Sequence, residues 1–280
     1  MGTSASYSGP TGTNPLLPPW AEEVANSDNN DSNHDEVGKD DNESRQESQP
    51  VSDLSGYESW TNVKSRFTAY ANSSTRSNFA ARRIARTFVS AQGGSKGASG
   101  ISRRGRSTAQ NLGGVLSGFA KSGENLAYNG VDFKDYVGKK ASEILSVLVD
   151  LVAPDNDDIE SSIARNASIE ALSKLFEIYD VDSKGLDALR NMSSDDMKVV
   201  FETYLSEYIF SSLLNKAGQH LNNMSDKEAD KCEKQVKSYI YSKVRLDISN
   251  TNLERINWKN VEGQSFVKNI FEIAYRMVQV

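Results

Sequence analysis

The sequence has few of the residues that most often build covalent or catalytic sites. It contains one cysteine, Cys232, in 280 residues, which excludes a disulfide within the chain. Of its two histidines, His34 lies in a polar tract and His220 stands alone after an expected helix. The spacings C-x-x-C, H-E-x-x-H and G-x-S-x-G do not occur. We therefore expect no enzyme activity, no catalytic residues, no cofactor and no metal site.

Long apolar runs are also missing, and so are the sequence signals of secretion or membrane insertion. The opening Met1–Ser6 fits the myristoylation pattern M-G-x-x-x-[ST], but this pattern is short and is often matched by chance. We expect a cytoplasmic protein with no membrane attachment.

Acidic residues are absent from the middle of the chain. Residues 60–123 hold 11 Lys/Arg and no Asp or Glu, whereas residues 21–59 hold 12 acidic and 2 basic residues. Residues 124–280 are again acidic, with 26 Asp/Glu against 19 Lys/Arg. The net charge of −6 therefore hides a basic middle between two acidic parts.

Composition divides the chain into four parts. Residues 1–20 are dense in Gly and Pro, which favours an extended or turn-rich arm. Residues 21–59 are too polar to offset the entropy of folding, which predicts a disordered acidic linker. Residues 60–123 form a basic, Gly- and Arg-rich helical region, and residues 124–280 a C-terminal helical domain. The expected fold is thus mainly α-helical, with an arm and a linker before the helical body.

Apolar spacing predicts most of the helices. One begins at Trp60, whose spacing to Val63, Phe67 and Tyr70 is helical, and a second follows around Phe79–Phe88. A helix closed by Pro154 is expected over residues 137–154, and a longer one over residues 155–180. The inner face of the longer helix is expected at Ile159, Ile163, Ala167, Ala171, Leu172, Leu175 and Ile178. A further helix opens on the Ser/Asp cluster at 193–196 and closes at Gly218.

Two glycine-rich stretches are expected to have little or weak helical structure. GGSKGASG, residues 93–100, lacks the spacing of a phosphate-binding loop and follows no apolar strand, so we interpret it as a flexible connector. The helical pattern of residues 101–123 is weakened by Gly105, Gly113, Gly114 and Gly118.

Residues 180–191, DVDSKGLDALRN, partly match a calcium-binding loop. Asp180, Asp182 and Gly185 occupy positions 1, 3 and 6. Position 5 is Lys184, which offers no oxygen, and position 12 is Asn191 where a bidentate glutamate is needed. Two helices joined by a polar turn that contains glycine explain the same residues, and we prefer that interpretation to a calcium site.

The basic middle has two interpretations that the sequence leaves open. Its unneutralised charges can contact phosphates of a nucleic acid, or can dock on an acidic partner or on the acidic linker of this chain. Trp60, Phe67, Phe79 and Phe88 fall at helical spacing and are expected in the core rather than stacked on bases. The candidate contact residues are Arg82, Arg83, Arg86, Arg103, Arg104 and Arg106.

Several segments together resemble a known family. GTSASYSGPTGTNPLLPPWA, then a variable polar tract, a Gly- and Arg-rich helical stretch and VLVDLVAP…IARNASIEAL resemble the QatB family of bacterial Qat anti-phage systems. The closing NWKNVEGQSFVKNIFEIAYRMV fits too. The resemblance implies a subunit without recognised catalytic residues. It also implies neighbours that resemble an ATPase, a QueC-like nucleotide-dependent enzyme and a TatD-like metal nuclease.

This resemblance suggests a role for the arm. QueC enzymes use ATP to activate a carboxylate on a deazaguanine, which an amine then attacks. After loss of Met1, Gly2 presents an unhindered amine, so we expect the arm to enter the active site of the QueC-like partner with Gly2 as acceptor. The expected partner-binding residues are Gly2, Thr3, Ser4, Ser6, Tyr7, Gly9, Pro10, Leu16, Leu17, Pro18, Pro19 and Trp20.

Two alternatives to this adaptor role stay open. In the first, the arm is an ordering segment that packs on the helical body of its own chain. In the second, the basic helices bind DNA or RNA and deliver the complex to invading nucleic acid.

Overall fold

The computed structural model describes residues 59–71, 78–190, 192–217, 225–247 and 251–280. The predicted arm and all but the last residue of the predicted linker lie outside the described residues. Everything described belongs to one compact unit, Ser52–Val280. The prediction of a mainly α-helical body is confirmed, because ten α-helices make up most of the described chain.

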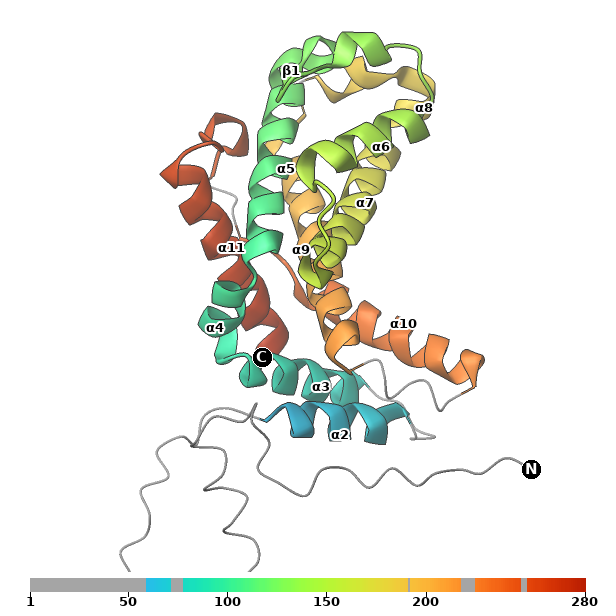
Figure 1. Cartoon of the computed structure of the whole chain (residues 1–280), viewed down its shortest axis with the longest axis vertical. Helices are drawn as coiled ribbons and strands as arrows, with labels where there is room; N and C mark the ends of the chain where they lie inside the picture. The colour runs from blue at the N-terminus through green and yellow to red at the C-terminus, as the bar shows by residue number, and fades with distance from the viewer. Residues whose placement is uncertain (1–58, 72–77, 191, 218–224, 248–250) are drawn as a thin grey trace, which may run out of the picture. The chain divides into compact units, whose positions relative to one another are not determined.

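Figure 1 shows the helices in their order along the chain. They are α2 Trp60–Ala71, α3 Asn78–Ala91, α4 Gly94–Ile101, α5 Arg103–Ser122, α6 Ala141–Val152, α7 Ile159–Tyr179, α8 Val181–Lys184, α9 Ser194–Ala217, α10 Asp226–Lys243 and α11 Val261–Gln279. Four short 3₁₀ turns are also described: η1 Gly123–Asn125, η2 Phe133–Tyr136, η3 Leu186–Leu189 and η5 Leu253–Arg255. A small hairpin after α5 joins β1 Ala127–Tyr128 to β2 Val131–Asp132, with Tyr128 opposite Val131.

One hydrophobic core runs through the described helices. Helices α7 and α9 lie along each other, α5 packs on α7 and α11, and α3 packs on α2, α10 and α11. Buried side chains from 60–123, such as Phe67 and Leu116, belong to the same cluster as Leu172 and Phe271 from 124–280. The change in charge near residue 123 therefore does not separate two cores.

The predicted flexible connector at residues 93–100 is wrong, because Gly94–Ile101 forms helix α4. Its small side chains let it lie closely on α11, where Ala98 and Ser99 are buried. The Ser99 hydroxyl donates to the backbone carbonyl of Lys268 at 3.2 Å. Packing on a neighbour thus outweighs the low helix propensity of this glycine-rich stretch.

Helix α5 is continuous over 20 residues despite its glycines. A Cβ on Gly105 would lie 2.4 Å from the ring of Tyr208, and one on Gly113 would lie 2.3 Å from the indole of Trp258. On Gly114 it would meet the Tyr128 hydroxyl at 2.3 Å. At these glycines, aromatic rings from different elements pack in direct contact with the backbone of α5, on more than one side of the helix.

Three predicted core positions, Phe79, Ile159 and Ile178, are exposed to solvent instead. Phe79 is 65% exposed at the start of α3, whereas Phe67 and Phe88 are buried and Trp60 is partly buried against the core, as expected. On α7 the buried face centres on Ala164, Ala167, Ala171, Leu172 and Leu175, and the predicted stripe is wrong at both ends. Ile159 is 63% and Ile178 38% exposed.

The stretch that partly matches a calcium-binding loop folds as two short turns. Asp180 ends α7 in the left-handed conformation with φ of 50°, α8 follows, and Gly185 with φ of 73° leads into η3. Within the described residues, no group of three or more His, Cys, Asp or Glu side chains is placed to hold a metal ion.

The predicted cap of the long helix α9 is confirmed. The Asp196 backbone N–H donates to Ser193 Oγ at 3.1 Å, and the Ser193 hydroxyl donates to Asp196 Oδ2 at 2.6 Å. The Tyr179 hydroxyl donates to the same carboxylate oxygen at 2.7 Å. Burial opposes ionisation of Asp196, but these hydrogen bonds outweigh it and lower the pKa of its carboxyl.

The close contacts at the glycines of α5 lead to a stability prediction. Gly113→Ala should lower the free energy of unfolding by roughly 1–3 kcal/mol, because the new methyl overlaps the Trp258 ring. Gly100→Ala is the matched control: it lies in helix α4 with nothing within 4 Å, and should raise stability by roughly 0.4–1 kcal/mol. Urea unfolding of both variants measures the difference. Equal stabilities would show that α5 does not need its close contact with the indole.

Candidate functional site

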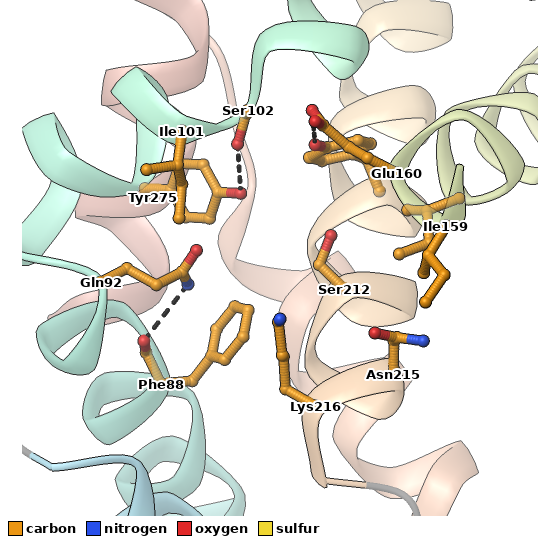
Figure 2. A pocket seen from close by; sticks show the side chains of 12 residues that line it. Phe88, Gln92, Ile101, Ser102, Ile159, Glu160, Ser212, Asn215, Lys216 and Tyr275 are labelled. Atoms are coloured by element: carbon orange, nitrogen blue, oxygen red, sulfur yellow. Dashed lines mark hydrogen bonds between the residues drawn. The ribbon is translucent and has the colours of Figure 1, made fainter. Parts of the chain in front are cut away.

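A cavity of about 220 Å³ opens where five segments of the body meet (Figure 2). One wall comes from α3, α4 and α11, and the other from the first turn of α7 and the end of α9. Most of the lining is apolar, with polar groups at one end and at the mouth. The lining residues are Phe88, Gln92, Ile101, Ser102, Ile159, Glu160, Ile163, Tyr208, Ser212, Asn215, Lys216 and Tyr275.

The polar end of the cavity is held by Ser102, the single residue between α4 and α5. Its hydroxyl donates to the Ala98 carbonyl at 2.8 Å and lies 2.9 Å from the hydroxyl of Tyr275. Because the Ser102 hydroxyl donates its proton to the Ala98 carbonyl, the Tyr275 hydroxyl is the donor in the hydrogen bond between Tyr275 and Ser102. Burial raises the pKa of Tyr275, so this hydroxyl stays protonated at neutral pH.

Glu160 joins the first turn of α7 to the first turn of α5. Its Oε1 accepts the backbone N–H of Arg104 at 2.8 Å and that of Gly105 at 3.2 Å. The Tyr208 hydroxyl donates to the same oxygen at 2.9 Å. The first N–H groups of a helix have no partner within it, and Ser102 supplies no side-chain cap. Glu160 therefore caps α5 from another helix, with its negative charge at the positive end of the helix dipole.

Aromatic rings form the wall behind this carboxylate. The rings of Tyr204 and Tyr208 stack with centroids 6.2 Å apart, and Phe271 meets Tyr208 edge-on at 5.4 Å. The Tyr204 hydroxyl donates to the carbonyl of Gly105 at 2.8 Å. Burial raises the pKa of Tyr208 far above its ordinary value, which makes it a hydrogen-bond donor rather than a base.

The mouth of the cavity combines two exposed isoleucines with one cation. Ile101 is 57% and Ile159 63% exposed, and they face the opening from opposite walls (Figure 2). Lys216 lies at the rim with its Nζ 5.9 Å from the ring centre of Trp60. The Trp60 and Phe88 rings meet edge-on at 6.1 Å. This arrangement suits an apolar group that has a polar or negatively charged group next to it.

The structure separates the predicted arginines into two sets. Arg82, Arg83 and Arg86 are exposed on α3, and none of them forms an ion pair with a carboxylate among the described residues. Arg104 pairs with Asp158 at 3.4 Å, whereas Arg106 donates from Nε to the Ser102 carbonyl at 3.3 Å.

Arg103 is exposed like Arg104, and Arg106 is half-buried. The arginines on α5 thus partly form contacts within the body, whereas the side chains of the arginines on α3 are exposed where a partner could contact them.

The other predicted site residues lie in the arm, Gly2 to Trp20, and so outside the described residues. The cavity itself was not predicted. In the sequence, Glu160 and Lys216 resemble the solvent-exposed charged residues found on most helices. Ser102 lies in a stretch whose glycines weaken the helical pattern. The one available signal was the spacing of Tyr204 and Tyr208, which places two large polar aromatics on one helix face.

Comparison with known proteins identifies the family. A family model described as "Qat anti-phage system associated protein QatB" matches residues 93–278, which is more than half of the chain. The chain belongs to the QatB family. The resemblance predicted from the sequence is thereby confirmed, and the chain is part of an anti-phage Qat system, which implies partner components. No curated protein and no solved structure matches.

The family match covers α4 to α11 and most of the cavity lining. The match does not extend to the arm, the acidic tract or the α3 arginines of this QatB-family chain. None of the helices in the described part of the chain has the length and apolar character needed to span a membrane.

The contacts of Glu160 lead to a second prediction. Glu160→Ala should lower the free energy of unfolding by roughly 1–3 kcal/mol, because two backbone N–H groups and the Tyr208 hydroxyl lose their acceptor. Glu160→Gln keeps a carbonyl oxygen at this position, so it should lower the free energy of unfolding by less than Glu160→Ala does.

The control is Glu177→Ala on the same helix, whose carboxylate makes an exposed ion pair with Lys174. It should change stability by less than about 1 kcal/mol. Chemical denaturation compares the three variants. A Glu160→Ala protein as stable as the Glu177→Ala protein would contradict the capping role.

Proposed function

We propose that this QatB-family chain is a non-catalytic adaptor that binds a QueC-like enzyme and presents its N-terminal arm to that enzyme's active site. The observation that carries the proposal is the sequence of the arm. A terminus of small residues, Gly2 to Ser6, is followed by a proline-rich apolar segment, Leu16–Trp20, and both are joined to the family-matched body by an acidic tract. Proline-rich segments lose little entropy on docking, and tryptophan buries a large area.

The chemistry of Gly2 suits it to act as an acceptor. An α-amine has a pKa of about 7.7–8.0, against about 10.4 for lysine, so a useful fraction is neutral at cellular pH. A QueC-like enzyme activates a carboxylate of a deazaguanine-type base with ATP, which forms an acyl adenylate and releases pyrophosphate. The Gly2 nitrogen then attacks the acyl carbon, a C–N bond forms as the C–O bond to AMP breaks, and the amine gives up a proton.

The tract between arm and body gives the arm its reach. Residues 21–59 number 39, and a flexible chain of that length has an r.m.s. end-to-end distance of roughly 31–37 Å. That distance exceeds the radius of a small domain, so an enzyme bound on the body lies within range. The ATPase and the TatD-like nuclease of the system are further partners in this proposal.

Intact mass measurement of the chain, co-expressed with its system and co-purified, tests covalent acceptance. Wild-type chain should lose Met1 and carry one added deazaguanine-type acyl group on Gly2. Gly2→Pro should lack it, because proline offers only a hindered secondary amine. Gly38→Pro, the same change in the acidic tract, should keep it.

An unmodified N-terminus in every chain of an active complex would overturn covalent acceptance. Deletion of residues 1–20 then tests docking alone. Loss of the QueC-like enzyme from the purified complex supports the adaptor role, and full retention contradicts it.

The exposed arginines of α3 favour a second candidate function, in which the chain binds nucleic acid. Arg82, Arg83 and Arg86 are free of carboxylates in the described part of the chain and lie on one helix. Three phosphate contacts would make binding strongly salt-dependent.

Changing all three α3 arginines to glutamine should weaken duplex DNA binding and lower the slope of log K against log salt by about 2.7, since each contact contributes about 0.9. The control changes the exposed Lys134, Lys139 and Lys140, which removes the same charge from another surface. Fluorescence anisotropy over a salt series compares the two. Equal binding by both variants would eliminate this candidate.

A further inference from the structure

The exposed side of helix α3 combines an aromatic ring with positive charge. Four exposed residues recur at positions i, i+3, i+4 and i+7 and therefore lie along one face of the helix, here called the α3 stripe: Phe79, Arg82, Arg83 and Arg86. Phe79 is 65% exposed, although its spacing predicted a place in the core. The opposite face of α3 carries buried residues such as Phe88, so the helix cannot turn to bury the Phe79 ring without exposing them.

Cations from two neighbouring helices lie next to this stripe. Helix α2 lies along α3 (Figure 1), and its Arg66 donates from Nη1 to Thr87 Oγ1 of α3 at 2.7 Å. On α10, which also packs on α3, the Lys243 ammonium lies 5.8 Å from the ring centre of Tyr239. The charge of Arg82 acts on the same tyrosine, because it opposes the rise that burial causes in the Tyr239 pKa.

No acidic side chain of α2 or α3 neutralises this surface, since residues 60–123 contain no Asp or Glu. The three arginines of the stripe also form no ion pair with a carboxylate elsewhere in the described ranges. The surface therefore attracts anions, and its charge is left for a partner to balance.

A polyanion that also carries flat rings fits this surface. Guanidinium groups bind phosphates through paired hydrogen bonds, and an exposed phenyl ring offers a face on which a base can stack. Bases in a duplex are already stacked on each other, so a single strand brings a base onto Phe79 at the lower cost. From Phe79 to Arg86 the helix rises about 10 Å, which matches about three nucleotides of a stacked strand at about 3.4 Å each.

An acidic protein would satisfy the arginines of the stripe but not its ring. Carboxylates pair with guanidinium groups as phosphates do. The exposed ring of Phe79, however, would need an apolar pocket among those carboxylates. A nucleic-acid strand repeats both a charge and a ring at every nucleotide, so it meets both requirements at once.

We propose that a single strand of nucleic acid binds along the α3 stripe, with one base stacked on Phe79 and its phosphates on the three arginines. This inference rests on the second candidate function, nucleic-acid binding by α3, and deepens it by naming the form of nucleic acid. The arginines bind the backbone of single strands and duplexes alike. The ring adds the preference for bases that are free to stack.

Fluorescence anisotropy of the full chain tests this assignment, with one labelled oligonucleotide used both as a single strand and as its duplex. Phe79→Leu keeps an apolar side chain at the position but removes the aromatic ring. It should weaken binding of the single strand by at least about fivefold, which corresponds to the loss of one stacked base. Binding of the duplex should not change.

Two matched variants control for the loss of an exposed apolar side chain. Phe79→Tyr keeps the ring and should bind the single strand as wild type does. Val137→Ala removes an exposed apolar side chain beside the exposed Lys139 and Lys140, and should change neither affinity. Urea unfolding should give all three variants the wild-type midpoint, because both side chains are exposed in the wild type.

Unchanged single-strand binding by Phe79→Leu would overturn the proposal, and so would an equal loss on single strand and duplex. If the change of all three stripe arginines to glutamine still weakens binding, the second candidate function stands without the stacked base. No binding of either oligonucleotide by the wild-type chain would overturn both. Displacement of the single strand by poly-L-glutamate as effectively as by unlabelled strand, charge for charge, would indicate an acidic protein as the partner and also overturn the proposal.

Discussion

The body depends on how closely helix α5 approaches the aromatic rings around it. Gly105, Gly113 and Gly114 leave the α5 backbone bare where Tyr208, Trp258 and Tyr128 lie against it. The Trp258 ring also stacks on Phe201 of α9 at 5.4 Å, so one indole fills the space between two long helices. Side chains at these positions would push the helices apart and open the core.

The start of α5 also lies beside the cavity, because Ser102, Glu160 and Tyr208 line it. With α5 close to α9, the first turn of α7 comes near the first turn of α5, and Glu160 can cap it. The carboxylate, the Ser102–Tyr275 pair and the stacked tyrosines close one end, while the other end stays open beside Trp60. The contacts that cap α5 thus form the polar end of the cavity, and Ile101 and Ile159 are exposed at its mouth.

Sequence patterns predicted the parts of this fold that depend on local rules. The helix at Trp60 and the capped helix α9 follow from apolar spacing and from the Ser193–Asp196 pair. Helix α4 and the continuity of α5 were missed because glycine lowers local helix propensity. Part of the compensating packing comes from residues far along the chain, such as Tyr208 and Trp258. The turn at Asn129–Gly130 was overlooked although Asn-Gly is a strong hairpin signal.

The cavity depends on long-range packing, which spacing alone does not reveal, whereas the arm could be singled out from composition alone. In the proposed function, the body binds the partner enzyme and the arm is presented to that enzyme's active site. The most direct test is the plating efficiency of phage on cells that carry the complete system, with residues 1–20 replaced by a shuffled sequence of equal composition. The account predicts loss of protection while the body stays folded and as stable as wild type. Full protection with the shuffled arm would contradict it.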